Sequence, residues 1–394
     1  MDSICDHNSC TGCQACKSVC PKSAIEMVEN ERGFVYPLVN KDLCIDCNLC
    51  QKVCPSINPV KKNPKQENVY ACWIKDAKNR KISTSGGMGY IFSKWILEQN
   101  GVYCGCRWNI DHAEHVCCEN PEELYQFQGS KYTYSDIGDS FKKIKDYLKQ
   151  TRKVLFTGTP CQVAGLKSFL RTEYENLFTV ELICHGYPSP LMLRKRIEQI
   201  ELETGKKLID LRFRHKVKNQ HFTCMKYTFE DGTDYQCTVF KDLFFRGFDG
   251  NYFLRENCFN CKYSTPERIA DLTIADFWGY YPKSLKYFNH LEGTSLVIPN
   301  SSKGLGLFEA LKDRIVIDKR TFDEASKGNP NLLHPQIKPK YYEDFWDKYS
   351  KGEDLIQLHE KYFPPIKEWR YSRKNRIKLF LKLLLKQLLC KRTY

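Results

Sequence analysis

Residues 10–21 read Cys10-Thr11-Gly12-Cys13-Gln14-Ala15-Cys16-Lys17-Ser18-Val19-Cys20-Pro21, and residues 44–55 read Cys44-Ile45-Asp46-Cys47-Asn48-Leu49-Cys50-Gln51-Lys52-Val53-Cys54-Pro55. Both runs follow the spacing C-x2-C-x2-C-x3-C-P. Three cysteines at this spacing wrap one face of a four-iron cube, and the fourth points to a second cube. One cube is therefore expected on Cys10, Cys13, Cys16 and Cys54, and the other on Cys44, Cys47, Cys50 and Cys20. The segment predicts a bacterial-ferredoxin-like module with two 4Fe-4S clusters.

The alternative for these runs is a pair of zinc knuckles or a set of disulfides. The 21 cysteines among 394 residues fit either a secreted disulfide scaffold or an intracellular metal protein. The first residues, MDSICDH, include neither a basic nor an apolar segment, so they do not resemble a signal peptide. We therefore expect a cytoplasmic protein whose thiols are reduced and available as ligands. No stretch reaches the roughly 18 apolar residues that a membrane span requires.

The chain is long enough for more than one domain. After Pro55 the sequence SINPVKKNPKQEN is rich in Pro, Lys and Asn, as is typical of a linker. We assign a dicluster domain to residues 1–56, a linker to 57–68, a larger domain to 69–320 and a helical, basic tail to 321–394. The fold class is an α+β ferredoxin-like dicluster domain followed by a larger α/β domain and a C-terminal helical tail.

Two further cysteines lie where expected strands end. Cys161 follows a strand at residues 153–156, and Cys184 follows a strand at residues 180–183. Ligands bind at the carboxyl ends of strands in open α/β sheets. With Cys258 and Cys261, an isolated C-x2-C pair, these thiols form a candidate set for a third 4Fe-4S cluster. The alternative is ordinary buried cysteines with one zinc-like pair.

The remaining cysteines near these motifs receive simpler interpretations. Cys5 is surplus to the two four-cysteine runs and is interpreted as a bystander. Cys104, Cys106, Cys117 and Cys118 adjoin one another on probable strands, and we interpret them mainly as small core residues.

Five blocks of sequence together resemble the beta subunits of the hydrogenases and dehydrogenases that use the deazaflavin coenzyme F420. The blocks are Ser83-Thr84-Ser85-Gly86-Gly87, Gly129-Ser130-Lys131-Tyr132, residues 156–166 (FTGTPCQVAGL), residues 184–190 (CHGYPSP) and residues 270–279 (ADLTIADFWG). They cover about residues 69 to 300. The resemblance implies an FAD-binding α/β domain that passes electrons between iron-sulfur clusters and a hydride-carrying substrate.

The resemblance places the flavin near the Ser-Gly-Gly and Gly-Ser-Lys-Tyr blocks. The implied flavin-binding residues are Ser85, Gly86, Gly87, Gly129, Lys131, Tyr132 and Asp276. Backbone N–H groups at Gly86 and Gly87 can approach a pyrophosphate at the start of the following helix, and Lys131 can supply charge. A plain loop with a solvated lysine is the alternative. Asp276 can instead cap a turn.

Two residues depart from the family pattern, and one histidine adds a possible role. Ala275 stands where glycine is expected, and Tyr187 stands where a small aliphatic residue is expected, which leaves the substrate in doubt. His185 can shuttle a proton or can be purely structural. Bacterial relatives without the deazaflavin coenzyme resemble parts of surface-polysaccharide pathways, so the resemblance suggests a substrate in that metabolism.

The last part of the tail, residues 367–394, holds most of the net charge of +14. From Lys367 onward ten Lys or Arg face a single acidic residue, Glu368. Lys378, Lys382 and Lys386 lie four apart among leucines, as in a basic amphipathic helix. Such a helix can contact an anionic membrane surface peripherally, and the alternative is a helix docked on the body or on a partner. Nucleic acid is not expected, because stacking aromatics are not interleaved with the charges.

These features predict an oxidoreductase that takes electrons from a ferredoxin or another redox partner. Its 4Fe-4S clusters would feed a flavin, and the flavin would exchange a hydride with a small-molecule acceptor or donor. The alternative is a non-catalytic electron-transfer subunit of a larger redox complex. Catalytic residues cannot be assigned from the sequence.

Overall fold

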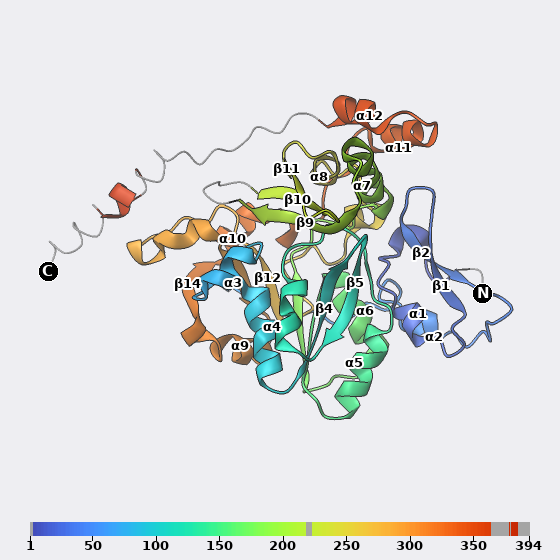
Figure 1. Cartoon of the computed structure of the whole chain (residues 1–394). Coiled ribbons are helices and arrows are strands. Elements are labelled where there is room, and N and C mark those ends of the chain that lie inside the picture. The colour runs from blue at the N-terminus through green and yellow to red at the C-terminus, as the bar shows by residue number, and fades with distance from the viewer. Residues whose placement is uncertain (1–2, 218–222, 364–377, 379, 385–394) are drawn as a thin grey trace.

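The computed structural model describes residues 3–217, 223–363, 378 and 380–384. Figure 1 shows a small N-terminal domain beside a large mixed sheet, with a smaller sheet and its helices packed above it. The N-terminal domain contains a hairpin of β1 (Ile25–Glu29) and β2 (Val35–Val39), in which Ile25 pairs with Val39. Short helices α1 (Ala15–Val19) and α2 (Leu49–Lys52) each follow a Cys-rich loop.

The large domain is built on a nine-stranded sheet in the order β14-β3-β13-β12-β8-β7-β4-β5-β6. Strands β4, β7, β8 and β12 run parallel to one another, and β13, β3 and β14 extend the sheet with antiparallel pairs. This mixed sheet confirms the predicted α/β architecture. The strands are β3 (Asn68–Ile74), β4 (Val102–Asn109), β5 (His112–Cys118), β6 (Ser135–Asp136), β7 (Val154–Gly158), β8 (Leu177–Leu182), β12 (Leu272–Asp276), β13 (Ser295–Pro299) and β14 (Ile315–Thr321).

Helices cover both faces of this sheet, because alternate residues of its buried strands point to opposite sides. On β7, Val154 and Phe156 pack with α5 (Ser140–Lys149) and α6 (Pro160–Leu170), whereas Leu155 packs with α4 (Met88–Glu98). Further helices are α3 (Ala77–Ile82), α9 (Ser302–Glu309) and α10 (Phe322–Gly328). The N-terminal domain packs on the α5–α6 face, where α1 contacts α6.

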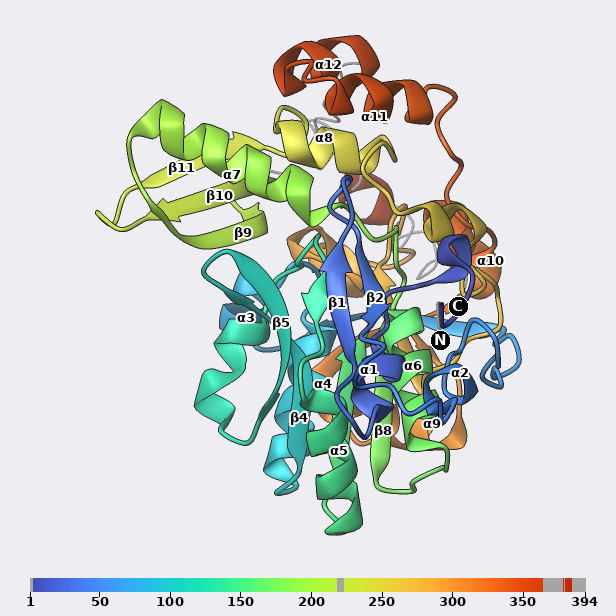
Figure 2. The same ribbon diagram turned by 90° about the vertical axis from the view of Figure 1, so that its right-hand side faces the viewer.

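The smaller sheet is an antiparallel meander with its own core. It consists of β9 (Leu208–Lys216), β10 (Thr223–Phe229) and β11 (Asp234–Thr238). Aromatic and aliphatic side chains join this sheet to α7 (Pro190–Thr204), α8 (Leu243–Asp249), α11 (Tyr342–Ser350) and α12 (Leu355–Tyr362). Figure 2 shows these helices above the large sheet.

The structure bears only in part on the predicted tail at residues 321–394. Helix α10 packs on the large sheet, while α11 and α12 pack on the smaller sheet. Residues 364–377, 379 and 385–394, which include most of the predicted basic amphipathic helix, lie outside the described residues. Within the described part of the chain, none of the helices has the length and apolar character needed to cross a membrane.

One pair of cysteines differs from expectation. Cys104 and Cys117 face each other across β4 and β5 with a Cα–Cα distance of 4.1 Å, and they form a disulfide. They are therefore a cross-strand covalent link as well as core residues, which corrects the expectation that both thiols are reduced. The strand register brings them together, and that register was not available from the sequence.

Candidate functional site

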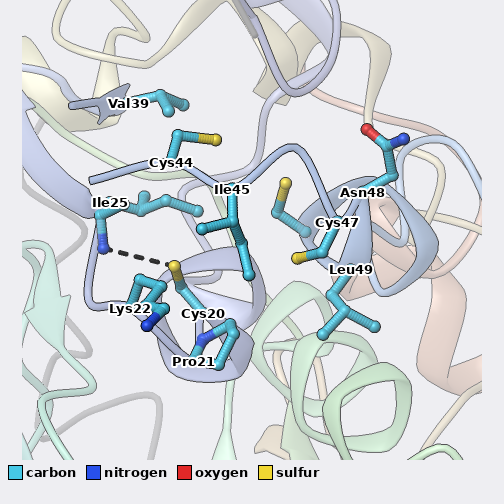
Figure 3. Close-up of a pocket in the computed structure, with 12 residues that line it drawn as sticks. Cys20, Pro21, Lys22, Ile25, Val39, Cys44, Ile45, Cys47, Asn48 and Leu49 are labelled. Atoms are coloured by element: carbon cyan, nitrogen blue, oxygen red, sulfur yellow. Dashed lines mark hydrogen bonds between the residues drawn. The ribbon is translucent and has the colours of Figure 1, made fainter. Parts of the chain in front are cut away.

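The N-terminal domain contains two pockets lined by cysteine. The first, which we call the outer pocket, brings Cys20 together with Cys44, Cys47 and Cys50 (Figure 3). Ile25, Val39, Ile45 and Leu49 supply apolar walls. Cys47 is exposed and the Ile45 side chain is 57% exposed, so this pocket borders solvent. The last cysteine of the first run thus lies with the first three of the second run.

The second pocket, the inner pocket, is lined by Cys10, Cys13, Cys16 and Cys54. Cys5 lines the same pocket, and a hydrogen bond from its thiol lowers the pKa of Cys10 and of Cys54 to about 6. Burial raises the pKa of Cys13 to about 12. Each pocket therefore offers four ligand thiols within apolar surroundings, which is the donor set that a 4Fe-4S cube requires.

The large domain gathers the third cysteine set, Cys161, Cys184, Cys258 and Cys261. Cys161 lies in the first turn of α6, Cys184 lies two residues after β8, and the other pair belongs to the loop after residue 255. Burial raises the pKa of Cys161 and of Cys258 to about 12. Burial is the main reason that the pKa of Cys184 is raised, and the thiolate charges of Cys161, Cys258 and Cys261 raise it further. The four thiols are therefore close together.

Polar contacts hold this third set in place. The Thr159 hydroxyl lies 3.2 Å from the Cys161 sulfur, and the Tyr187 backbone N–H donates to the Cys258 sulfur at 3.2 Å. Among the described residues, no group of three or more His, Cys, Asp or Glu side chains is arranged to hold a single metal ion.

The third set lies beside the inner pocket. Besides burial, the charge of Cys161 raises the pKa of Cys13. Tyr263 packs in the same core as these two thiols, and burial and their charges raise its pKa. Gly165 of α6 packs directly against Cys13, because a Cβ added to it would lie 2.9 Å from the Cys13 Cβ. The three cysteine sets therefore follow one another from the surface into the large domain.

The two loops that the resemblance linked to a flavin meet in the structure. The Ser130 backbone N–H donates to the Thr84 hydroxyl at 2.8 Å, which joins residues 129–132 to residues 83–87. The Ser85 hydroxyl donates to the Thr294 carbonyl at 2.8 Å. Gly86 packs against the Cys72 carbonyl, and Gly87 has a φ of +86°, so both positions favour glycine.

A stripe of cations on β9 borders these loops and was missed in the sequence. Arg212, Arg214 and Lys216 alternate along the strand and therefore lie on one face. Arg214 forms an ion pair with Asp276 and lies 3.4 Å from the Tyr132 hydroxyl. The pattern R-x-R-x-K was a usable signal, but its strand belongs to the smaller sheet, so only the tertiary structure reveals what it faces.

Lys216 and Lys131 make mainly internal contacts. The Lys216 ammonium donates to the Ser85 carbonyl at 2.9 Å. The Lys131 ammonium donates to the Phe127 carbonyl at 2.8 Å, and burial lowers the pKa of Lys131 to about 8. The surplus of positive charge around the loops matches an anionic group such as a pyrophosphate.

His185 directly follows Cys184 of the third set and is linked to Tyr132 through the Phe248 ring. Its Nδ1 lies 3.0 Å from the Gln336 amide nitrogen, and among the described residues its buried Nε2 has no hydrogen-bond partner. Burial lowers its pKa. The Phe248 ring contacts both His185 and Tyr132, with ring centroids 4.7 and 4.9 Å away.

Comparisons with known proteins support two parts of this arrangement. Residues 9–58 match the family described as 4Fe-4S dicluster domain, and residues 151–325 match the family described as the C terminus of the coenzyme F420 hydrogenase/dehydrogenase beta subunit. A similar solved structure is that of the xenon-derivatised F420-reducing [NiFe] hydrogenase complex from Methanosarcina barkeri, with 15% identity and a TM-score of 0.44 over 77% of this chain and 91% of that chain. No curated protein matches the chain. The family matches confirm the resemblance drawn from the sequence.

Proposed function

From a chain that joins a 4Fe-4S dicluster domain to a domain of the coenzyme F420 hydrogenase/dehydrogenase beta-subunit family, we propose an iron-sulfur oxidoreductase with a single internal route for electrons. The outer pocket receives electrons from a ferredoxin-type donor, and the inner pocket passes them to Cys161, Cys184, Cys258 and Cys261. The observation that carries this proposal is the contact of Cys13 with Gly165, which brings the dicluster domain against the helix that holds Cys161.

The solvent-facing side of the outer pocket supports the proposed entry point. Cys47 is exposed, whereas Cys10, Cys13 and Cys54 of the inner pocket are buried. A donor protein can therefore approach the outer pocket more closely than these three buried thiols. Electrons then move away from solvent toward the large domain.

The proposed exit is a flavin site between residues 83–87 and the β9 stripe. A bound flavin would accept single electrons and exchange a hydride with the substrate. Arg214 and Lys216 supply positive charge beside residues 83–87, where Gly86 and Gly87 themselves are buried and the Gly86 N–H donates to the Ser295 hydroxyl at 3.0 Å. Asp276 holds Arg214 in position through their ion pair. FAD binding at these residues is part of the proposal.

Coenzyme F420, named in the family description, is one candidate for the hydride carrier, and a metabolite of surface-polysaccharide synthesis is another. The competing proposal is an electron-transfer subunit that makes no turnover of its own within a larger redox complex. It draws on the same cysteine sets but requires no substrate site. The two proposals differ in whether the isolated chain holds a flavin and reduces a small molecule.

Anaerobic purification with iron, sulfide and flavin measured per chain tests both proposals. About 12 irons with one FAD supports the full route, and about 8 irons without flavin favours the relay subunit. Cys161→Ser should lower the iron content by about four per chain. Cys237→Ser, in a cysteine of β11 outside the three sets, is the matched control and should leave the iron unchanged. Protein without iron after reconstitution would refute both.

A further inference from the structure

Arg255 is a fully buried arginine at the junction of the two domains, with an exposure of 0%. Its Nε donates to the Cys10 carbonyl at 2.8 Å, and its Nη1 donates to the Val35 carbonyl at 2.7 Å. The guanidinium carbon lies 3.6 Å from the centroid of the Tyr36 ring. Among the described residues it has no carboxylate partner within salt-bridge distance. The chain thus buries a positive charge directly beside the loop that carries the first inner-pocket ligand.

The same residue reaches the third cysteine set through its backbone. The Arg255 N–H donates to the Tyr187 carbonyl at 2.9 Å, and the Tyr187 N–H donates to the Cys258 sulfur at 3.2 Å. The Cys258 N–H in turn donates to the Arg255 carbonyl at 2.9 Å. The guanidinium therefore lies between the inner pocket and the third set.

One nitrogen of the Arg255 guanidinium is left without a hydrogen bond among the described residues. Nη2 of Arg255 is buried and, within the described part of the chain, has no hydrogen-bond partner. A buried N–H donor without an acceptor is costly, and such donors are normally satisfied. Cluster sulfurs are acceptors, and hydrogen bonds and positive charge close to a cluster are among the factors that set its reduction potential.

Burial alone would make the inner cluster harder to reduce than the outer cluster. Reduction adds a negative charge, and a buried site disfavours that charge more than a site at the surface does. Cys10, Cys13 and Cys54 of the inner pocket are buried and Cys16 is partly buried, whereas the outer pocket includes the exposed Cys47. Without compensation, electrons would therefore remain on the outer cluster. A buried cation beside the inner pocket favours the added negative charge and so opposes this preference.

We propose that Arg255 raises the reduction potential of the inner cluster above that of the outer cluster, so that each electron moves inward. In this step one electron leaves the outer cube, which is oxidised, and enters the inner cube, which is reduced, without proton transfer. Arg255 is a positioning and tuning residue, since it acts through the cluster rather than on a substrate. The inference rests on the proposed electron route.

The test is a redox titration of the whole protein, loaded with clusters and followed by electron paramagnetic resonance. Signals are assigned with Cys13→Ser for the inner cluster and Cys47→Ser for the outer one. In the unaltered chain the inner cluster should be reduced first. Arg255→Gln should shift the electron distribution between the two clusters at least tenfold toward the outer one, equivalent to about 59 mV for a one-electron couple.

Two further variants separate charge from packing. Arg255→Lys keeps the charge and should leave the order of reduction unchanged. Arg80→Gln is the matched control, because Arg80 is also buried, donates to the Asn289 and Gly293 carbonyls and lies over the ring of Trp73, far along the sheet from the cysteine pockets. It should leave both potentials unchanged.

Each outcome decides the inference. An equal shift in the lysine and glutamine variants, or no shift in a fully loaded glutamine variant, would overturn it. If the glutamine variant does not hold clusters, the order of reduction in the unaltered chain decides, since reduction of the outer cluster first contradicts the inference. Absence of clusters from the unaltered chain would instead refute the proposed function.

Discussion

Replacing Gly165 by alanine tests whether the dicluster domain is seated on α6 as closely as the structure indicates. Alanine in a helix interior gains about 0.5–1 kcal/mol over glycine. At this position, however, the new Cβ would lie 2.9 Å from the Cys13 Cβ and 3.1 Å from its sulfur. Overpacking of this kind costs about 1–3 kcal/mol.

Gly306 provides a matched control. It lies inside α9, and nothing within 4 Å obstructs an added Cβ. Gly306→Ala should therefore show the helix-propensity gain alone. Because this gain cancels between the two variants, the difference between their stabilities equals the overpacking cost of about 1–3 kcal/mol.

The assay is the rate at which the loaded protein loses its visible iron-sulfur absorbance in guanidinium chloride under argon. If the strained contact is released on the way to cluster loss, Gly165→Ala should lose absorbance about 5- to 150-fold faster than Gly306→Ala, corresponding to about 1–3 kcal/mol. Equal or slower loss in Gly165→Ala would show that Cys13 does not approach α6, and the proposed transfer from the inner pocket to the third set would lose its support.

Three other predictions use the same chain. Glu181→Gln leaves the buried Arg268 without its charged partner and should lower the free energy of unfolding by about 3–5 kcal/mol. The surface control Glu98→Gln should lower it by about 0–1 kcal/mol. Equal shifts of the denaturant midpoint in the two variants would contradict this prediction. Burial lowers the pKa of His115 from 6.5 to about 4, so stability should fall by about 3 kcal/mol as pH drops from about 6.5 to 4, and His115→Gln should flatten that slope. In electron paramagnetic resonance, Cys20→Ser should abolish the signal of the outer cluster, whose other ligands belong to the second run. Cys54→Ser should abolish the signal of the inner cluster, whose other ligands belong to the first run. The reverse result would disprove the crossed ligand sets.

The sequence was sufficient wherever ligand spacing or local pattern carries the information. The two cysteine runs predict the dicluster domain because 4Fe-4S ligation is imposed by spacing along a short segment. The turn between β10 and β11 is also a local feature, since it lies at Asp231-Gly232, a dipeptide typical of hairpin turns. Family blocks identified the large domain, although the order of its nine strands was not predicted.

Features that depend on contacts between distant segments were not predictable. Arg255 is one arginine among many in the sequence, and its role follows only from its contacts with Cys10 and Val35, more than 200 residues away. The Cys104–Cys117 disulfide depends on the register of two strands. Local propensity does not determine either one.

The linker between the two domains makes contacts with the large domain. The segment 57–68 was expected to be a simple spacer, but the backbone of Asn63 pairs with that of Arg268 through hydrogen bonds of 2.6 and 3.2 Å. The Arg268 side chain pairs with the buried Glu181 and donates to the Tyr263 carbonyl at 2.9 Å. The linker is therefore tied to the loop that follows Cys261. Since the Arg268–Glu181 ion pair supports both the linker contact and this loop, loss of Glu181 should loosen the third cysteine set and the seating of the dicluster domain together, although Lys62 and the Asn63 side chain also hold the linker.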